Sequence, residues 1–385
     1  MMPKLKVLQT MDKAEMPRTN APHAGMPALD ASADGTSWFE FAPAHLFYTP
    51  IAIYCGWLSL RHFGPTLLTN ANPSLPYSGL VGESKFAVLS EVKGEARDLI
   101  SPYVRSLRWG GEGGLERSVT EAMQLIEETE LSFPLVAKPD IGMRGVGVQI
   151  VRDQTELRTY ASTFPTGANF ILQALIDEEG EAGVFYIREP GEAKGRITSL
   201  TLKYFPRVTG DGKLTLRELI MVDPRAGKLA HLYMERHRER LDQVIGDGES
   251  IRLAFAGSHS RGTIFRNGND QITEAMTDAF DQIARSVDEF YIGRFDVRFG
   301  DFDAFKDGKG FRIIEINGAG GEQTHIWDAR TTLGEAYRAL LQQFGALYRI
   351  GAANRRRGFK PSSLKTLIKV WLGEKKLTKH YPITH

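Results

Sequence analysis

The chain has 385 residues, of which 42% are hydrophobic, and its formal net charge is +1. A chain of this length and composition can bury a sizeable core, divided over two or three lobes, and its near-neutral charge gives no reason to expect a nucleic-acid partner. Cys55 is the only cysteine, which excludes an intrachain disulfide. The lack of an intrachain disulfide, together with the lack of a continuous apolar signal-peptide core at the N-terminus, favours a cytoplasmic location.

The N-terminal part divides into two segments. Residues 1–36 mix Pro, Gly, Asp, Lys and Met with little periodicity, which predicts a disordered arm. Residues 38–63 are apolar and aromatic, but Pro50 and Arg61 interrupt them, so a buried helix is favoured over a membrane span. Membrane contact by this segment is the alternative, and it would use Phe47, Tyr54 and Trp57.

A glycine-rich loop follows in residues 133–151, FPLVAKPDIGMRGVGVQIV, which predict strand, loop, strand. Lys138 ends the first strand, and Gly142, Gly145 and Gly147 lie in the loop. Glycines let a loop fold closely over phosphates and present backbone N–H groups, and a lysine adds a point charge. The pattern matches neither the Walker motif nor the dinucleotide fingerprint, so it is a weak signal alone.

Helical spacing of apolar residues appears at 115–130, around 155–162 and in 270–290. Residues 133–205 are expected to form strands, interrupted by the helix around 155–162. The stretch HLYMERHRER, with His231, Tyr233, Glu235 and His237, is assigned to a solvated face rather than a metal site, because no closed set of ligands at metal-binding spacing appears.

Residues 295–321, FDVRFGDFDAFKDGKGFRIIEINGAGG, hold two short apolar runs around a polar turn, which predicts a hairpin. Residues two apart in a strand share a face, so Glu315 and Asn317 project together and pairing brings Asp296 beside them. Two carboxylates and an amide oxygen suit a hard cation such as Mg²⁺. An ordinary surface hairpin is the alternative, but the isoleucines around Glu315 favour burial, and a buried carboxylate needs a partner or a metal.

The tail, residues 351–385, holds nine Lys or Arg residues and one acid. Its apolar residues fall at helical spacing, at Leu364, Leu367, Ile368, Trp371 and Leu372. Two readings are equally weighted: a basic amphipathic helix in peripheral contact with an anionic membrane surface, or a terminal helix docked on the protein with its lysines in water.

These motifs occur in the order found in the ATP-grasp ligases, which the chain resembles over residues 83–345. The resemblance is strongest to D-alanine–D-alanine ligase-like enzymes, and residues 208–227 resemble cyanophycin synthetase. It implies an α+β fold in which two lobes sandwich ATP. The expected divisions are the arm 1–36, a short N-terminal region 37–112, a small lobe 113–205, a large lobe 206–350 carrying the metal site, and the basic tail 351–385.

The resemblance also implies roles for single residues. The ATP-binding positions are Lys85, Lys138, Gly142, Gly145, Gly147 and Lys203 for the phosphates, Gln173, Ala174, Leu175 and Ile176 for the adenine edge, and Glu181 for the ribose. The ligands of Mg²⁺ or Mn²⁺ are Asp296, Glu315 and Asn317, and Arg294 steadies the reacting acyl group. Gly320 lies in a Gly318–Gly321 turn that replaces the Ser/Thr-Pro-Gly of the family, which leaves the acceptor unidentified. Arg225, His259 and Arg261 contact a ligand or are merely polar loop residues, with even weight.

The implied activity is ATP-dependent joining of a carboxylate and an amine, or another nucleophile, through an acyl phosphate. The alternatives are a phosphotransferase on the same fold and a nucleotide-binding protein without ligase activity. The metal site is expected to face solvent. Because residues 37–85 replace a fuller N-terminal lobe, a large substrate, presented by a membrane or a carrier, is also expected.

Overall fold

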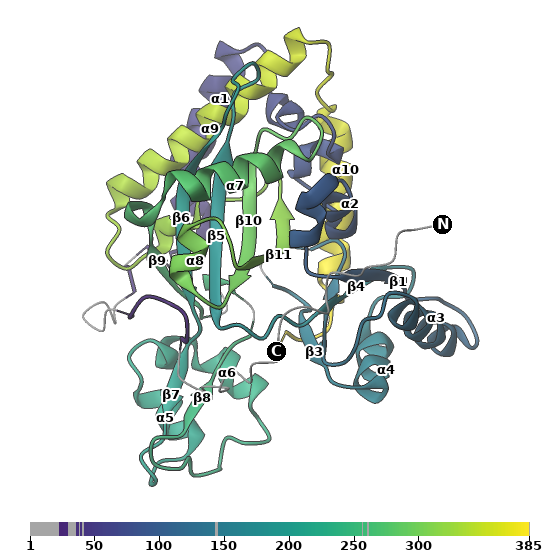
Figure 1. The fold of residues 1–385 in the computed structure, drawn as a ribbon, viewed down its shortest axis with the longest axis vertical. Helices are drawn as coiled ribbons and strands as arrows, with labels where there is room; N and C mark the ends of the chain where they lie inside the picture. The colour runs from purple at the N-terminus through teal and green to yellow at the C-terminus, as the bar shows by residue number, and fades with distance from the viewer. Residues whose placement is uncertain are drawn as a thin grey trace.

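A computed structural model describes residues 23–29, 36–37, 39–40, 42–142, 145–255, 257–259 and 262–384. Most of the predicted disordered arm and Arg261 lie outside these residues. The described part contains sheets of five, four and two strands, each with its own helices (Figure 1).

The five-stranded sheet is antiparallel throughout, in the order β11-β10-β5-β6-β9. Its strands are β5 (Gly180–Ile187), β6 (Arg196–Tyr204), β9 (Ile264–Asn267), β10 (Ile292–Phe299) and β11 (Phe311–Asn317). Helix α7 (Glu274–Arg285) covers one face and α9 (Leu333–Arg356) lies behind the other (Figure 1). Because strand residues alternate between faces, Val184 packs in the cluster of α7 and Phe185 in that of α9.

The four-stranded sheet has the order β1-β4-β2-β3. Its strands are β1 (Tyr103–Leu107), β2 (Leu135–Pro139), β3 (Gln149–Val151) and β4 (Asn169–Ala174). Helices α3 (Gly114–Glu128) and α4 (Gln154–Thr163) pack on it through Ile126 and Leu157, and both fall where the sequence predicts helices.

The sheets do not divide at the expected boundary of residue 205. Strands β5 and β6 were expected in the small lobe, but β5 pairs with β10 and is buried along its whole length in the five-stranded sheet. Strand β1 in turn precedes the expected start of the small lobe at residue 113. Strand pairing between distant segments decides this division, and the local sequence does not encode it.

A third, small unit follows β6. It contains β7 (Arg207–Thr209), β8 (Ser250–Arg252), α5 (Leu216–Val222) and α6 (Ala230–Arg236) around its own hydrophobic cluster. The assignment of HLYMERHRER to a solvated face is wrong for Tyr233, which is fully buried in that cluster. The residue sits on the inner side of a short helix, and its ring faces apolar neighbours.

Helix α1 (Ala44–Arg61) lies against α9. Phe47, Ile51 and Leu58 are buried, whereas the opposite side of the helix is exposed, so the prediction of a buried helix is right for one face only. Among the described helices, none is both long and apolar enough to cross a membrane.

The tail forms α10 (Leu364–Thr378) and a short terminal segment, residues 379–384. Leu367 is buried, and Leu377 and Tyr381 pack against the cluster of the four-stranded sheet. The rest of the predicted apolar stripe is exposed, namely Leu364, Ile368, Trp371 and Leu372. The tail is therefore docked at its end and through Leu367, while an apolar stripe still faces outward.

Candidate active site

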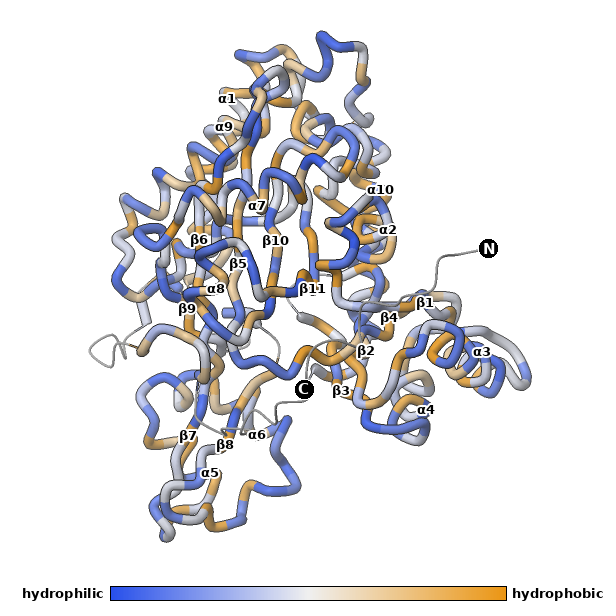
Figure 2. Tube along the Cα trace, in the orientation of Figure 1, coloured by the Kyte–Doolittle hydropathy of each residue, from blue (hydrophilic) through white to orange (hydrophobic). Residues whose placement is uncertain are grey.

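The predicted hairpin is present as β10 and β11, although the connection holds a short helix, α8 (Phe302–Lys306), rather than only a polar turn. Asp296 pairs with Glu315, and Arg294 with Asn317. Apolar and charged residues alternate along β10 (Figure 2). One face therefore supplies Phe295 and Val297 to the core under α7, and the other presents charged side chains to a cavity.

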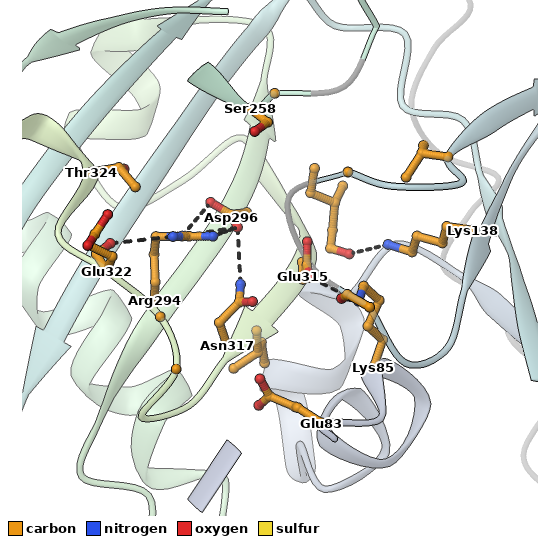
Figure 3. A pocket seen from close by; sticks show the side chains of 18 of the residues that line it. Glu83, Lys85, Lys138, Ser258, Arg294, Asp296, Glu315, Asn317, Glu322 and Thr324 are labelled. Atoms are coloured by element: carbon orange, nitrogen blue, oxygen red, sulfur yellow. Dashed lines mark hydrogen bonds and ion pairs between the residues drawn. The ribbon is translucent and has the colours of Figure 1, made fainter. Parts of the chain in front are cut away.

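Asp296 is the most heavily contacted carboxylate of this face. Its oxygens accept hydrogen bonds from Arg294 Nε at 3.0 Å and Nη2 at 2.9 Å, from Lys203 Nζ at 2.8 Å, and from Asn317 Nδ2 at 3.1 Å (Figure 3). Burial by itself would raise the pKa of Asp296, but the charges of Arg294 and Lys203 outweigh it and hold that pKa below its ordinary value. The expectation that the metal site faces solvent is wrong for Asp296, which is 3% exposed.

Lys203 links Asp296 to a second buried carboxylate, Glu181. Its Nζ lies 2.9 Å from Glu181 Oε1, and Arg298 Nε lies 3.0 Å from Glu181 Oε2. All of these side chains are buried. Burial lowers the pKa of Lys203, yet Asp296 and Glu181 raise it more, so the lysine stays charged. The result is a linear chain of alternating positive and negative side chains across β5, β6 and β10.

Lys138 lies opposite this chain, on β2. Its Nζ donates to Gln173 Oε1 at 2.8 Å and to the Ile314 carbonyl at 2.9 Å. The lysine is buried, and burial lowers its pKa to about 8. Gln173 and Ala174 are the last residues of β4, and together with Leu175 and Ile176 they line the same end of the cavity.

Lys85 begins α2 (Lys85–Ser90), whose N-cap is Ser84. Its Nζ donates to the carbonyl of Gly142 and lies 3.4 Å from Glu315 Oε1. Glu315 keeps a quarter of its side chain exposed, so its carboxylate is more accessible than that of Asp296. Lys85 thus ties the glycine-rich loop to the hairpin.

The glycine-rich loop joins β2 and β3 as predicted, and Met143 and Arg144 in it lie outside the described residues. Gly145 and Gly147 have positive φ, and a Cβ on Gly147 would meet the Pro139 ring at 2.8 Å, so glycine is required there. Gly142 and Gly145 line the cavity, but Gly147 does not.

The terminal segment holds this loop. Thr384 Oγ1 donates to the Gly145 carbonyl at 2.8 Å and accepts from Gly147 N at 3.0 Å. Tyr381 donates to the Ile141 carbonyl at 2.6 Å. Farther along the tail, Glu374 accepts from Gly82 N at 2.9 Å and itself lines the cavity.

All of these elements enclose one cavity of about 290 Å³. It is lined by every predicted site residue except Gly147: Lys85, Lys138, Gly142, Gly145, Gln173, Ala174, Leu175, Ile176, Glu181, Lys203, Arg294, Asp296, Glu315, Asn317 and Gly320. His259 also lines it, whereas Arg225 does not reach it and forms a buried ion pair with Glu40 at 2.6 Å.

The cavity also contains residues that the sequence analysis missed. Glu83 accepts from Gly318 N at 2.9 Å, and burial raises its pKa to about 8. Its place two residues before Lys85 was a usable signal. Glu322 accepts from Tyr48 at 2.6 Å and from the Trp327 indole at 3.0 Å. Nothing local in the sequence connects Tyr48 with Glu322, because 274 residues separate them.

The donor set fits a small divalent cation. In the described part of the chain, no three His, Cys, Asp or Glu side chains gather at one point. Asp296, Glu315 and the Asn317 amide nevertheless share one wall of the cavity (Figure 3). Mg²⁺ is commonly held by one or two carboxylates together with substrate phosphates, so a full protein cage is not needed.

Comparison with known proteins adds a family match to this geometry. The family model described as the RimK-like ATP-grasp domain matches residues 111–188, which run from α3 through β5. The match covers part of the chain and shows similarity to an ATP-grasp domain over those residues. This agrees with the resemblance stated from the motifs and with the α+β arrangement. A search of curated proteins gives no significant match.

Among solved structures, similar folds include a bifunctional glutathione synthetase from Pasteurella multocida, with 15% identity, a TM-score of 0.34, and coverage of 67% of this chain but 36% of that one. The D-alanine–D-alanine ligase from Bacillus anthracis has 13% identity, a TM-score of 0.42, and coverage of 74% and 72%. The VanG D-Ala:D-Ser ligase from Enterococcus faecalis has 12% identity, a TM-score of 0.39, and coverage of 71% and 64%. The chain thus spans about a third of the length of the synthetase.

Proposed function

We propose that this protein is an ATP-dependent ligase that joins a carboxylate to an amine through an acyl phosphate. The observation that carries the proposal is the convergence of Lys85, Lys138, Arg294, Asp296 and Glu315 on one cavity. The match of residues 111–188 to the ATP-grasp family model supports it. Cationic side chains that can bind phosphates and oxygen atoms that can bind a metal thus lie together where two lobes join.

The reaction would proceed in two steps. An oxygen of the substrate carboxylate attacks the γ-phosphorus of ATP, which forms the acyl phosphate and releases ADP. The amine then attacks the acyl carbon, inorganic phosphate leaves, and the amine gives up a proton as the amide forms. Most of the rate enhancement in such reactions comes from positioning and charge neutralisation rather than covalent chemistry.

Each side chain has a proposed role in these steps. Lys138 and Lys85 contact the phosphates, and residues 173–176 contact the adenine edge. Glu181 receives the ribose hydroxyls and Lys203 supports the phosphate side. Arg294 stabilises the developing oxyanion, so Arg294→Lys should impair turnover, because lysine lacks the planar fork. Asp296, Glu315 and Asn317 would hold Mg²⁺, which supplies charge neutralisation at the phosphates when bound.

The acceptor side is proposed to lie near the Gly318–Gly321 turn, beside Glu83 and Arg294. Backbone carbonyls approach this turn closely: Ala319 N donates to the Ser78 carbonyl at 2.8 Å, and Gly320 N donates to the Gly79 carbonyl at 2.9 Å. A Cβ on Gly320 would lie 2.7 Å from that oxygen. Replacement of Gly320 by alanine should therefore displace the turn and lower turnover more than nucleotide affinity.

The first test is calorimetry with Mg·ATP on the full chain. Binding in the low to middle micromolar range, on the order of −7 kcal/mol, is expected, and a folded protein that binds no Mg·ATP would contradict the proposal. The second candidate function is a phosphotransferase, because the same phosphate-binding groups would serve it. With a competent substrate, release of ADP together with free phosphate favours the ligase, whereas ADP with a stable phosphorylated product favours the phosphotransferase.

Peripheral membrane contact through the tail is also proposed. The exposed stripe of α10 and its lysines support it, while the docking of Tyr381 and Thr384 supports the alternative of a helix bound to the body. Because the terminal segment holds the glycine-rich loop, deletion of the tail would remove the proposed membrane contact and would also disturb the loop. Point substitutions on the stripe, such as Ile368→Gln with Leu372→Gln, test the membrane contact alone.

A further inference from the structure

The outer face of α1 is apolar along its length. Leu46, Ile53, Trp57 and Leu60 fall at spacings of seven, four and three residues, which places them on one side of the helix. They are 63%, 70%, 51% and 77% exposed, and Phe63 just beyond the helix is 87% exposed. The exposed stripe of α10 holds the same number of such side chains over a shorter length of helix.

The inner face of α1 is apolar as well. Phe47 and Ile51 pack with Phe39, Trp327 and residues of α9, and Leu58 packs with Tyr348. A helix that is hydrophobic on all sides is normally covered on all sides. The helix contains no acidic residue, and its only Lys or Arg is Arg61. Its outer face therefore has the composition of a buried surface.

Arginines gather at the C-terminal end of α1. Arg61 lies with its guanidinium 5.3 Å from the Trp57 ring centroid. Arg355, in the last turn of α9, donates to the carbonyls of His62 and Phe63 at 2.8 Å each. Burial lowers the pKa of His62, and Arg61, Arg349, Arg355 and Arg356 lower it further, which places four positive charges around this point. Of these, Arg349 pairs with Glu189 at 2.9 Å.

We propose that the outer face of α1 and the arginines at its C-terminal end bind the surface of an anionic lipid bilayer. The helix would lie in the plane of the interface, with Ile53, Trp57 and Leu60 among the acyl chains. Tryptophan and long cationic side chains are suited to that depth, because an apolar body is joined to a polar end. The arginines would contact anionic headgroups, each contributing attraction that salt screens.

The same helix reaches the cavity. Tyr48, one turn in from the start of α1, lines it and donates to Glu322, whose backbone carbonyl accepts from Arg294 Nη1 at 3.4 Å. A bilayer bound to α1 would therefore bring one end of the cavity near the membrane surface. The proposal rests on α1 and the arginines near its C-terminal end, and it does not depend on the ligase function.

Co-sedimentation of the full chain with vesicles tests the proposal. The protein should bind vesicles of phosphatidylcholine with phosphatidylglycerol, bind pure phosphatidylcholine vesicles less, and be released as salt rises. Ile53→Gln with Leu60→Gln should lower the partition coefficient on the order of tenfold or more, because two buried apolar side chains are lost from the lipid. Arg61→Gln with Arg356→Gln should remove the preference for anionic vesicles.

Matched controls separate α1 from other surfaces. Met221→Gln with Val222→Gln removes two exposed apolar side chains from α5 and should leave vesicle binding unchanged. All four α1 positions are exposed, so the variants should fold, which circular dichroism checks. The proposal is overturned if wild-type protein binds neither vesicle, if only the α10 pair Ile368→Gln with Leu372→Gln lowers binding, or if light scattering shows a dimer that the Ile53/Leu60 variant dissolves.

Discussion

The two walls of the cavity are held together by different forces. On the five-stranded sheet, Asp296, Glu181, Lys203 and Arg298 form buried ion pairs between 2.8 and 3.0 Å. On the four-stranded sheet, the glycine-rich loop is held by hydrogen bonds from Tyr381 and Thr384, at the end of the chain. One wall is held by buried charges, and the other by hydrogen bonds with the terminal segment, which itself packs through Tyr381.

This difference suggests how the site would accommodate a nucleotide. Buried charges without partners are costly, so the hairpin wall must stay paired whether or not a ligand is bound. Phosphates and a metal would have to share or replace pairs that already exist. Apart from the bond that Lys85 donates to Gly142, the hydrogen bonds that hold the loop wall join neutral groups. Each of these is worth about 1 kcal/mol, so this wall can adjust at lower cost.

The largest effects should come from the hairpin wall. We expect Asp296→Asn and Glu315→Gln each to lower turnover by on the order of a thousandfold or more, because the proposed metal loses a charged ligand. Only Asp296→Asn should also destabilise the fold, by about 3 kcal/mol, since it leaves Lys203 and Arg294 buried beside a neutral group. Steady-state kinetics and urea unfolding measure the two quantities separately.

Glu315→Gln serves as the internal control, because Glu315 is partly exposed and its ion pair with Lys85, at 3.4 Å, is longer than the ion pairs of Asp296. Equal stability of the two variants would show that the buried ion pairs do not support the wall. Since the pKa of Asp296 is depressed in the folded state, its stabilisation is full above the ordinary carboxyl range and is lost as the pH falls toward the folded value. The Asn variant should lack this acid dependence.

Lys138 should give the next largest effect. Burial lowers the pKa of Lys138 to about 8, so in the protein without nucleotide this lysine is largely neutral above that pH. Because bound phosphates favour the charged lysine, binding of Mg·ATP above that pH should take up a proton. Calorimetry in two buffers of different ionisation enthalpy measures this uptake. Lys138→Met should abolish it and weaken binding on the order of tenfold or more. Proton uptake that persists unchanged in Lys138→Met would assign it to another group.

Substitutions in the terminal segment should have smaller effects. Thr384→Val removes two hydrogen bonds to the glycine-rich loop, and Tyr381→Phe removes one. We expect a loss of nucleotide affinity of about fivefold for Thr384→Val and about half of that effect, in free energy, for Tyr381→Phe. Hydrogen exchange of residues 141–149 should rise in the same order. Ser363→Ala, at the N-cap of α10, controls for general loosening of the tail.

Glu83→Gln should change stability least at low pH. Burial raises the pKa of Glu83 to about 8, so below about pH 4 its carboxyl is protonated in both the folded and the unfolded protein and resembles the amide. A raised carboxyl pKa contributes stability at low pH that is lost as the pH rises through the folded value. The free energy of unfolding of wild-type protein should therefore fall relative to Glu83→Gln as the pH rises from about 5 to about 8. Parallel pH profiles would show that Glu83 is ionised throughout.

Much of the site could be predicted because its elements are local. The β10–β11 hairpin follows from alternation around Asp296 and Glu315, and the loop at Gly142 to Gly147 follows from glycines between two apolar runs. Each of the two motifs spans fewer than about thirty residues, so a short connection joins the strands that pair within it. The prediction that the metal site faces solvent is wrong for Asp296, because the exposure of this residue depends on which cations from β6 and β10 pack against it.

By itself, the sequence determined the motifs, their order and the type of the strands that carry them, since periodicity and glycine placement act over a few residues. Only the tertiary structure decided that β5 and β6 join the sheet of β10, that the end of the chain holds the glycine-rich loop, and that Tyr48 reaches Glu322. It also decided that α1 buries one apolar face and exposes the other. These features depend on contacts between residues more than a hundred positions apart, and local sequence patterns carry no information about such contacts.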